Sequence, residues 1–409
     1  METKDIPVLL LTGYLGSGKT TLVNHILANK QGLRFAVIVN DIGEVNIDAE
    51  LIQRQGVVNS KDESLVALQN GCICCTLRTD LIDQIFELTK LQSFDYILIE
   101  ASGICEPEPI AQTICQIPEL GGNFTKYGTV RMDCIVTVVD ALRMRDEFSE
   151  GNALKRNDLD EEDIENLLIQ QIEFCNVVLL NKASEVAPEE LRHIEEIIRT
   201  LQPKAEIIEC DYGEVDLRKL VNTHQFSFGH VATSAGWIQE INRSLDDIEE
   251  EEHEHHAHHH AHEEHDHEEH GHHHHQHHHD HDHGEAEEYG ISSFVYYRRK
   301  PFDMNKFDYF ICNEWPKSVI RCKGVCYFAD ERDMSYLYEQ AGQQKLLSQA
   351  GQWYASMPET KLMLIMQQEP DLVSEWDEEY GDRMQKLVFI GQKMDRDEIC
   401  RKLDECLTE

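Results

Sequence analysis

Short, continuous apolar runs alternate with stretches of helical periodicity over the first half of the chain. Runs rich in Val, Ile and Leu that end in a polar residue or a turn are typical of strands buried on both faces of a parallel sheet. These runs are Pro7–Thr12, Phe35–Asn40, Tyr96–Glu100, Cys134–Asp140 and Val177–Asn181. Between them, stretches such as Thr20–Ala28 and Pro188–Leu201 have the apolar spacing of amphipathic helices. The pattern predicts a doubly wound, mostly parallel α/β domain over residues 1–222.

The pattern changes twice beyond residue 222. Residues 246–288 contain almost no large apolar side chains, so they cannot bury enough surface to offset the entropy of ordering. We therefore predict a linker over residues 223–289, in which residues 246–288 are disordered without metal. A smaller α+β domain is expected over residues 290–409. Its predicted strands are Ser292–Tyr297, Ser318–Phe328, Leu362–Met366 and Leu387–Gly391, and its predicted helices are Asp330–Gln340 and Arg396–Leu407.

The formal net charge of -40 is extreme and unevenly distributed. Residues 246–288 hold seventeen acidic side chains and no Lys or Arg, which leaves about -23 (-40 plus 17) for the remainder. Nucleic-acid binding needs clustered basic residues, so we expect no nucleic-acid partner. No apolar stretch approaches the roughly 18 residues of a membrane span, and Ile6–Leu11 lacks the basic flank of a signal peptide. We expect a cytoplasmic protein with no membrane partner.

The segment Gly13–Thr20 reads GYLGSGKT, which matches the phosphate-binding pattern Gly-x4-Gly-Lys-Ser/Thr. Its glycines let backbone N–H groups cradle phosphate oxygens, and the following helix adds its positive end. We predict a nucleotide site that uses Lys19 on the phosphates and the Thr20 hydroxyl on Mg²⁺. The expected nucleotide-binding residues of this loop are Gly13, Gly16, Ser17, Gly18, Lys19, Thr20 and Thr21.

Two later strands end in polar residues that suit the same site. Tyr96–Gly103 reads YILIEASG, where Glu100 can hold the Mg²⁺ water shell and Gly103 can sense a γ-phosphate. The segment Asn181-Lys182-Ala-Ser184 is similar to the guanine-reading motif Asn-Lys-x-Asp. GTP is favoured, although Ser184 replaces the aspartate that accepts hydrogen bonds from guanine. Lys19, Thr20 and Glu100 are the candidate catalytic residues, and Asn181 and Lys182 the candidate base-binding ones.

Three cysteines, Cys72, Cys74 and Cys75, lie within the sequence GCICC. Thiolates select soft or borderline ions such as Zn²⁺ or Cu(I), and a fourth ligand must come from elsewhere or stay open for exchange. Asp41 and Glu44 follow the second predicted strand and are candidates for that ligand. In the last domain, Cys322 and Cys326 are interpreted as a packed pair of small side chains rather than a second metal site.

Nineteen of the 23 histidines lie between His253 and His283, interleaved with carboxylates. Such a tract offers many exchangeable sites for Zn²⁺, Ni²⁺ or Co²⁺, but it cannot impose one geometry. We expect it to buffer metal rather than to discriminate between metals. A purely solubilising acidic linker is the alternative.

These segments together resemble the CobW-type P-loop GTPases, a metallochaperone family. The matching segments are GYLGSGKTTLVNHIL, NDIGEVNIDAELI, GCICC, ILIEASGICEP, VTVVDA and NKAS, with SSFVYYRRKPFD, RCKGVCYFA and LVFIGQKMDRDEI in the last domain. The resemblance implies a slow GTPase, stimulated by metal or client, that binds a transition metal at Cys72, Cys74 and Cys75. It also implies delivery of that metal to a client metalloprotein when GTP is hydrolysed. Asp41 stands where members of the family often carry Glu.

The leading hypothesis is a GTP-dependent zinc chaperone with Mg²⁺ and Zn²⁺ as cofactor and cargo. One alternative is a metal storage protein that acts through the histidine tract. Another keeps the GTPase and changes the cargo to cobalt, for cobalamin or nitrile hydratase maturation, with Ni²⁺ a further possibility. The sequence does not choose among these metals, because thiolates and imidazoles accept several divalent ions.

Overall fold

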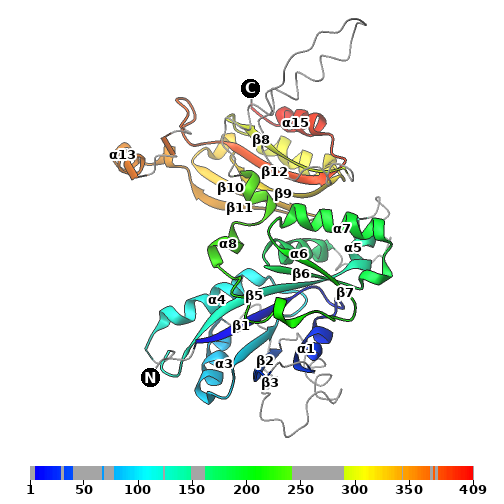
Figure 1. Ribbon diagram of the computed structural model, residues 1–409. Helices are drawn as coiled ribbons and strands as arrows, with labels where there is room; N and C mark the ends of the chain where they lie inside the picture. Colours follow the sequence, from blue (N-terminus) through cyan, green and yellow to red (C-terminus); the bar gives the residue numbers. More distant parts are fainter. Residues whose placement is uncertain are drawn as a thin grey trace, which may run out of the picture. The chain divides into compact units, whose positions relative to one another are not determined.

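A computed structural model describes residues 5–28, 32–39, 67–68, 78–122, 125–148, 162–241, 290–342, 344–368, 372–373 and 376–408. It divides the chain into two compact units, Met1–Gly236 with Gly342–Gln344, and Trp237–Ala341 with Lys345–Glu409. Within the described part of the chain, no helix is long and apolar enough to cross a membrane. Figure 1 labels most of the helices and strands of each unit.

The first unit is built on a seven-stranded parallel sheet in the order β3-β2-β4-β1-β5-β6-β7. Its strands are β1 (Asp5–Thr12), β2 (Phe35–Val39), β3 (Ala67–Leu68), β4 (Tyr96–Glu100), β5 (Thr129–Asp140), β6 (Val177–Asn181) and β7 (Glu206–Cys210). Its helices are α1 (Lys19–Ala28), α3 (Arg78–Leu91), α4 (Pro107–Leu120), α5 (Ala141–Phe148), α6 (Glu162–Glu173), α7 (Pro188–Leu201) and α8 (Phe228–Ala232), and α9 (Gly236–Ile241) follows.

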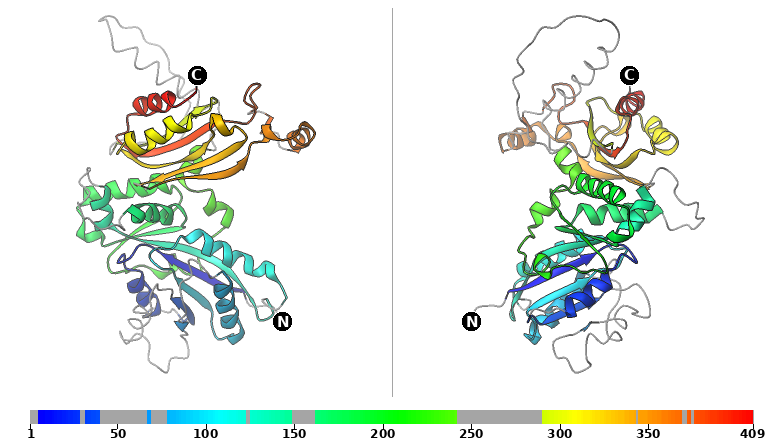
Figure 2. Two further views of the ribbon diagram at one scale, coloured as in Figure 1. Left: turned by 180° about the vertical axis from the view of Figure 1, so that it is seen from behind. Right: turned by 45° about the vertical axis from the view of Figure 1, so that its right-hand side comes forward.

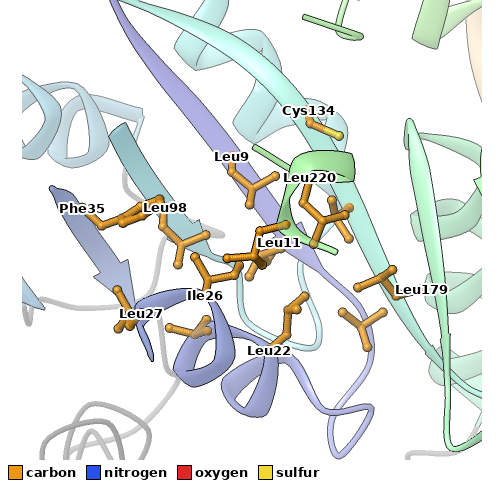
Figure 3. Close-up of a cluster of buried hydrophobic side chains, with 14 of the residues drawn as sticks. Leu9, Leu11, Leu22, Ile26, Leu27, Phe35, Leu98, Cys134, Leu179 and Leu220 are labelled. Atoms are coloured by element: carbon orange, nitrogen blue, oxygen red, sulfur yellow. The ribbon is translucent and has the colours of Figure 1, made fainter. Parts of the chain in front are cut away.

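The sheet is covered on both faces, which explains the continuous apolar runs of its strands. On one face, Leu9 and Leu11 of β1 pack with Leu22 and Ile26 of α1 in a buried cluster (Figure 3). Alternate residues such as Leu10 are buried equally, because successive side chains of a strand point to opposite faces. Helix α4 packs against β5 and β1, and Figure 2 gives two further views of these layers. The doubly wound α/β prediction is confirmed.

Strand β1 lies in the middle of the sheet, and this position determines where a ligand can bind. The chain adds β2, β3 and β4 on one side of β1 and then β5, β6 and β7 on the other. In open α/β sheets, ligands bind outside the carboxyl ends of the strands where the strand order reverses in this way. The loop that follows Thr12 therefore leaves the sheet at its topological switch point.

The second unit is a five-stranded antiparallel sheet in the order β11-β10-β9-β12-β8. Its elements are β8 (Ile291–Arg298), α12 (Met304–Tyr309), β9 (Val319–Cys326), β10 (Met334–Ala341), β11 (Gln344–Gln352), α13 (Glu359–Gln368), β12 (Gln385–Gln392) and α15 (Arg396–Glu405). Aromatic side chains dominate the core, where Phe302 and Phe307 stack with centroids 4.7 Å apart. The α+β prediction for this part of the chain is confirmed.

Two element predictions in this unit are wrong. The pattern predicts a helix over Asp330–Gln340, but Met334–Ala341 forms β10, in which Tyr336 and Tyr338 are buried at the alternate spacing of a strand. It predicts a strand over Leu362–Met366, but this segment lies within helix α13, where Leu364 is 61% exposed. In both places the short apolar pattern by itself does not distinguish a helix from a strand.

Cys322 and Cys326 both lie in the aromatic core of this unit with no exposed surface. Burial raises the pKa of both thiols well above the usual value, so they are neutral side chains at physiological pH. They pack as small apolar groups.

Candidate functional site

The loop between β1 and α1 is held in a shape that only glycine allows at two of its corners. Gly13 has φ 128°, and a Cβ there would lie 2.2 Å from the carbonyl oxygen of Val138 on β5. Gly18 has φ 109°, and a Cβ there would lie 2.3 Å from Nδ2 of Asn181 at the end of β6. Any larger residue would combine a strained backbone with a steric clash. The loop is therefore packed directly against the ends of β5 and β6.

Lys19 places its ammonium group inside this loop. Its Nζ donates hydrogen bonds to the carbonyl oxygens of Gly13 (2.6 Å) and Tyr14 (3.2 Å), and the residue is 7% exposed. The guanidinium of Arg143 lies 3.9 Å from the ring centroid of Tyr14, a cation–π contact that supports the outer part of the loop. A buried cation at the N-terminus of α1 is well suited to bind phosphate oxygens.

The other predicted residues of the loop have differing environments. Gly16 has φ 78°, and a Cβ there would meet no atom within 4 Å. Ser17 is 1% exposed, and its hydroxyl has no hydrogen-bond partner among the described residues. Thr21 is exposed in the first turn of α1. The buried Ser17 hydroxyl is thus an unused polar group in the interior of the loop.

Thr20 and Glu100 are brought together across 80 positions of sequence. The Thr20 hydroxyl donates a 2.9 Å hydrogen bond to Oε1 of Glu100, which is 2% exposed at the end of β4. The pairing follows from the sheet, in which Leu11 of β1 lies beside Glu100. A hydroxyl and a carboxylate in contact form a pair of hard oxygen donors, the ligand type that Mg²⁺ prefers.

The turn after β4 lies against the same loop. A Cβ at Gly103 would lie 2.7 Å from the backbone nitrogen of Leu15, so glycine is required for this close approach. The fully buried Gln171 of α6 donates from Nε2 to the carbonyl oxygens of Gly103 (3.4 Å) and Cys105 (3.0 Å). These bonds fix the backbone of the turn against the sheet.

A second set of bonds connects Gln171 to the end of β1. The Thr137 hydroxyl donates to the backbone oxygen of Gln171 (2.7 Å) and lies 2.9 Å from the hydroxyl of Thr12. Because a hydroxyl has one hydrogen, Thr12 is the donor in the second bond. Gln171 is not predicted by the sequence, since a glutamine in an amphipathic helix has no distinguishing pattern.

Asn181 joins two loops at the end of β6. Its Nδ2 donates to the carbonyl oxygen of Ser17 (2.7 Å), and its Oδ1 accepts from the backbone N–H of Gly213 (3.2 Å). The Cys210 thiol also points at Oδ1, at 3.7 Å, and burial raises its pKa to about 11. The side chain is 3% exposed, so it acts here as a brace between the loop after β1 and the loop after β7.

Lys182 adopts a left-handed backbone conformation with φ 60°. Its Nζ forms an ion pair with Oδ2 of Asp140, the last residue of β5. The other oxygen of Asp140 accepts a 3.2 Å hydrogen bond from the backbone N–H of Arg143. Asp140 was not identified from the sequence, and its role depends on β5 and β6 being neighbours.

Ser184, the residue that departs from the guanine-reading motif, also has an acidic partner. Oδ1 of Asp211 accepts hydrogen bonds from its backbone N–H (3.1 Å) and from its hydroxyl (2.9 Å). Asp211 directly follows β7 and was likewise not identified from the sequence. A carboxylate is therefore present beside Ser184, although it comes from another loop.

The predicted transition-metal ligands Asp41, Glu44, Cys72, Cys74 and Cys75 lie outside the described residues, as does the tract His253–His283. Within the part of the chain that is described, no three His, Cys, Asp or Glu side chains gather as a metal site. The described strands nearest in sequence are β2, which ends at Val39, and β3, which ends at Leu68 and pairs with β2 in parallel.

Two family models match this chain. The nucleotide-binding domain of CobW/HypB/UreG matches residues 7–209, and the C-terminal domain of the cobalamin synthesis protein cobW matches residues 291–407. The chain is 35% identical over 425 residues to "Zinc-regulated GTPase metalloprotein activator 1" of Dictyostelium discoideum, with 99% of this chain and 80% of the relative covered.

Bacterial relatives match over a shorter length. "Zinc chaperone CobW" of Pseudomonas aeruginosa is 33% identical over 55% of this chain, and "Zinc chaperone YjiA" of Escherichia coli is 30% identical over 54%. The match spans 62% of each of those two proteins, which is less than two thirds. The solved structure of Zn(II)-bound YjiA from E. coli aligns over 99% of both chains at 19% identity, with a TM-score of 0.39. From the relative matched along nearly the whole chain and from both family models, this protein belongs to the CobW family of P-loop GTPases.

Proposed function

We propose that this protein is a GTP-dependent zinc chaperone. It would bind Zn²⁺ at Cys72, Cys74 and Cys75 and transfer the ion to a client metalloprotein when GTP is hydrolysed. The observation that carries the proposal is the likeness over 99% of the chain to a relative named as a zinc-regulated GTPase metalloprotein activator. The names of the bacterial relatives, which are zinc chaperones, favour zinc over cobalt or nickel as the cargo.

The sheet supports a link between nucleotide and metal. In a parallel sheet all strands end at the same edge, so β2 and β3 end at the edge where β1 and β4 end at Thr12 and Glu100. The cysteine cluster begins four residues after β3 ends at Leu68. Asp41 and Glu44 follow β2 by two and five residues. The two segments that contain the five candidate ligands therefore both begin at the edge of the sheet where Lys19 and Glu100 lie.

The roles of the nucleotide residues follow from their contacts. Lys19 would bind the phosphates from within the loop, while Asn181 and Lys182 would hold the base side of the site against it. The Thr20 hydroxyl and the Glu100 carboxylate fit Mg²⁺, because both are hard oxygen donors and lie 2.9 Å apart. When bound, Mg²⁺ would neutralise charge on the phosphates. Hydrolysis is expected to be slow and to be stimulated by metal or client.

Zinc binding by cysteine variants tests the proposed cargo site. The full chain should bind one Zn²⁺ tightly, and Cys74→Ala should lose that site and keep GTP binding. Cys312→Ser is a matched control, because Cys312 is an exposed thiol of the other unit. Equal tight binding by Cys74→Ala and the parent would contradict the proposal. Deleting residues 246–288 separates it from metal storage, since a chaperone keeps the tight site and a storage protein loses nearly all its metal.

We also propose that the protein acts in the cytoplasm. Cys134 and Cys175 are fully or nearly buried thiols in the first unit, and burial raises the pKa of Cys175 to about 12. Neutral, packed thiols suit a reducing compartment, where cysteines persist in the reduced form.

A further inference from the structure

The guanine-reading position of this chain is occupied by a residue that lacks the usual charge. In the motif Asn-Lys-x-Asp, a carboxylate accepts hydrogen bonds from N1–H and the exocyclic amine of guanine. The corresponding residue here is Ser184. A neutral hydroxyl does not provide two acceptors in a fork, so Ser184 alone gives little preference for guanine over other bases.

Asp211 is held beside this position by two hydrogen bonds. Its Oδ1 accepts from the backbone N–H and the hydroxyl of Ser184, at 3.1 and 2.9 Å. Both residues reach the surface, so a ligand has access to them. Both of these hydrogen bonds end on Oδ1, so neither of them uses Oδ2 of Asp211. An ionised carboxylate has about four lone-pair sites, which leaves capacity for donors from a ligand.

The backbone around Asp211 is fixed relative to the phosphate loop. Cys210, the preceding residue, lies beside Asn181 in the register of β6 and β7. Gly213, two residues further on, donates its N–H to Oδ1 of Asn181 (3.2 Å), and Asn181 donates to the carbonyl oxygen of Ser17 (2.7 Å). Asp211 is therefore positioned by the same brace that holds the base side of the site.

Two other aspartates near this end of the sheet are already engaged. Asp140 forms an ion pair with Lys182 and accepts from the backbone of Arg143. Asp216 is bound through both oxygens by the guanidinium of Arg218. Asp211 differs from both, because Ser184, its side-chain partner among the described residues, is neutral.

We propose that Asp211 supplies the carboxylate that reads the N1–H and exocyclic amine of guanine, in place of Ser184. The acidic group has moved from the loop after β6 to the loop after β7, and the serine holds it in place. Asp211 and Ser184 thus form one unit, in which the hydroxyl occupies the motif position and the acid comes from the loop after β7. This inference rests on the proposed GTP site and adds the residue that determines its base specificity.

Asp211→Asn tests the assignment with two nucleotides. Xanthine carries a carbonyl where guanine carries its amine, so an amide side chain complements xanthine and a carboxylate complements guanine. The affinities of the full chain for GTP and xanthosine triphosphate are measured with fluorescent analogues. We expect the parent to prefer GTP, and Asp211→Asn to lose roughly 10- to 100-fold in GTP affinity and to prefer xanthosine triphosphate.

Two further variants make the test independent of one substitution. Asp216→Asn removes the same charge five residues away and should keep the GTP preference. The exchange Ser184→Asp with Asp211→Ser returns the acid to the motif position and should also prefer GTP. The inference would be overturned if Asp211→Asn kept the GTP preference, or if the exchanged variant lost it. Either result would leave the proposed GTPase function unaffected. A parent that binds no GTP would overturn the proposed function as well.

Discussion

Replacing Asn181 by alanine removes the brace between the phosphate loop and the loop after β7. The substitution leaves the carbonyl oxygen of Ser17 and the N–H of Gly213 without their partner, in a region where Asn181 itself is 3% exposed. A buried group left unsatisfied costs about 1–3 kcal/mol, so two such groups cost about 2–6 kcal/mol. Water that enters the space left by the side chain would bring the loss toward the lower end.

The loss is measured as a shift in the melting temperature of the first unit. For a domain of this size, 1 kcal/mol shifts the midpoint by roughly 2–4 °C, so Asn181→Ala should melt at least about 4 °C below the parent. Asn181→Asp is the informative control. It keeps an acceptor for Gly213 but places a carboxylate oxygen against the carbonyl of Ser17.

Both variants should weaken GTP binding, because the loop that surrounds Lys19 loses its support from β6. A melting temperature of Asn181→Ala within about 1 °C of the parent, with unchanged GTP affinity, would refute the brace.

Two further predictions concern buried polar groups of the first unit. Asp133 has no exposed side-chain surface and accepts hydrogen bonds from Tyr96, Arg131 and two backbone N–H groups. Burial alone would raise the pKa of Asp133, but these hydrogen bonds lower it below the usual value. The stabilisation that Asp133 contributes is therefore complete above the unfolded pKa of about 3.9 and is lost as the pH falls through the folded pKa. Asp133→Asn should lower the free energy of unfolding by about 2–3 kcal/mol at pH 7 and remove part of the acid dependence of unfolding. Equal stability of the variant and the parent at pH 7 would contradict this prediction. Gln171→Ala should weaken GTP binding by loosening the turn at Gly103. The control is Gln202→Ala, which removes another buried glutamine, one that bonds the backbone of Glu173, and should leave GTP affinity unchanged. Equal effects of the two variants on GTP affinity would argue against a positioning role for Gln171.

Local patterns predicted much of the first unit, because the chemistry of the phosphate loop is contiguous in sequence. Gly13, Gly18 and Lys19 fall within eight residues, and the buried strands on both sides of the motif are continuous apolar runs. The sequence pattern does not predict strand β7, since Glu206–Cys210 is short and carries two acidic residues. Without this strand, the sequence does not indicate that Asp211, the residue directly after β7, lies at the site.

The remaining site residues depend on strand order, which the sequence does not show. Asp140, Asn181 and Cys210 lie side by side because β5, β6 and β7 are neighbours in register. Gln171 reaches the turn after β4 only because α6 packs over Thr137. In the second unit, the sequence pattern predicts a helix where β10 forms, since aromatic and polar residues at Tyr336–Gln340 have no clear period until their pairing with β9 is known.

The most direct test of the account is GTP hydrolysis by the purified full chain, measured against buffered free Zn²⁺. The account predicts that the rate or the GTP affinity changes as one Zn²⁺ binds, and that combined replacement of Cys72, Cys74 and Cys75 by serine abolishes the response. Cys312→Ser should keep it. Hydrolysis that is the same at every Zn²⁺ concentration, in a protein that binds the metal, would contradict coupling between the nucleotide and the metal.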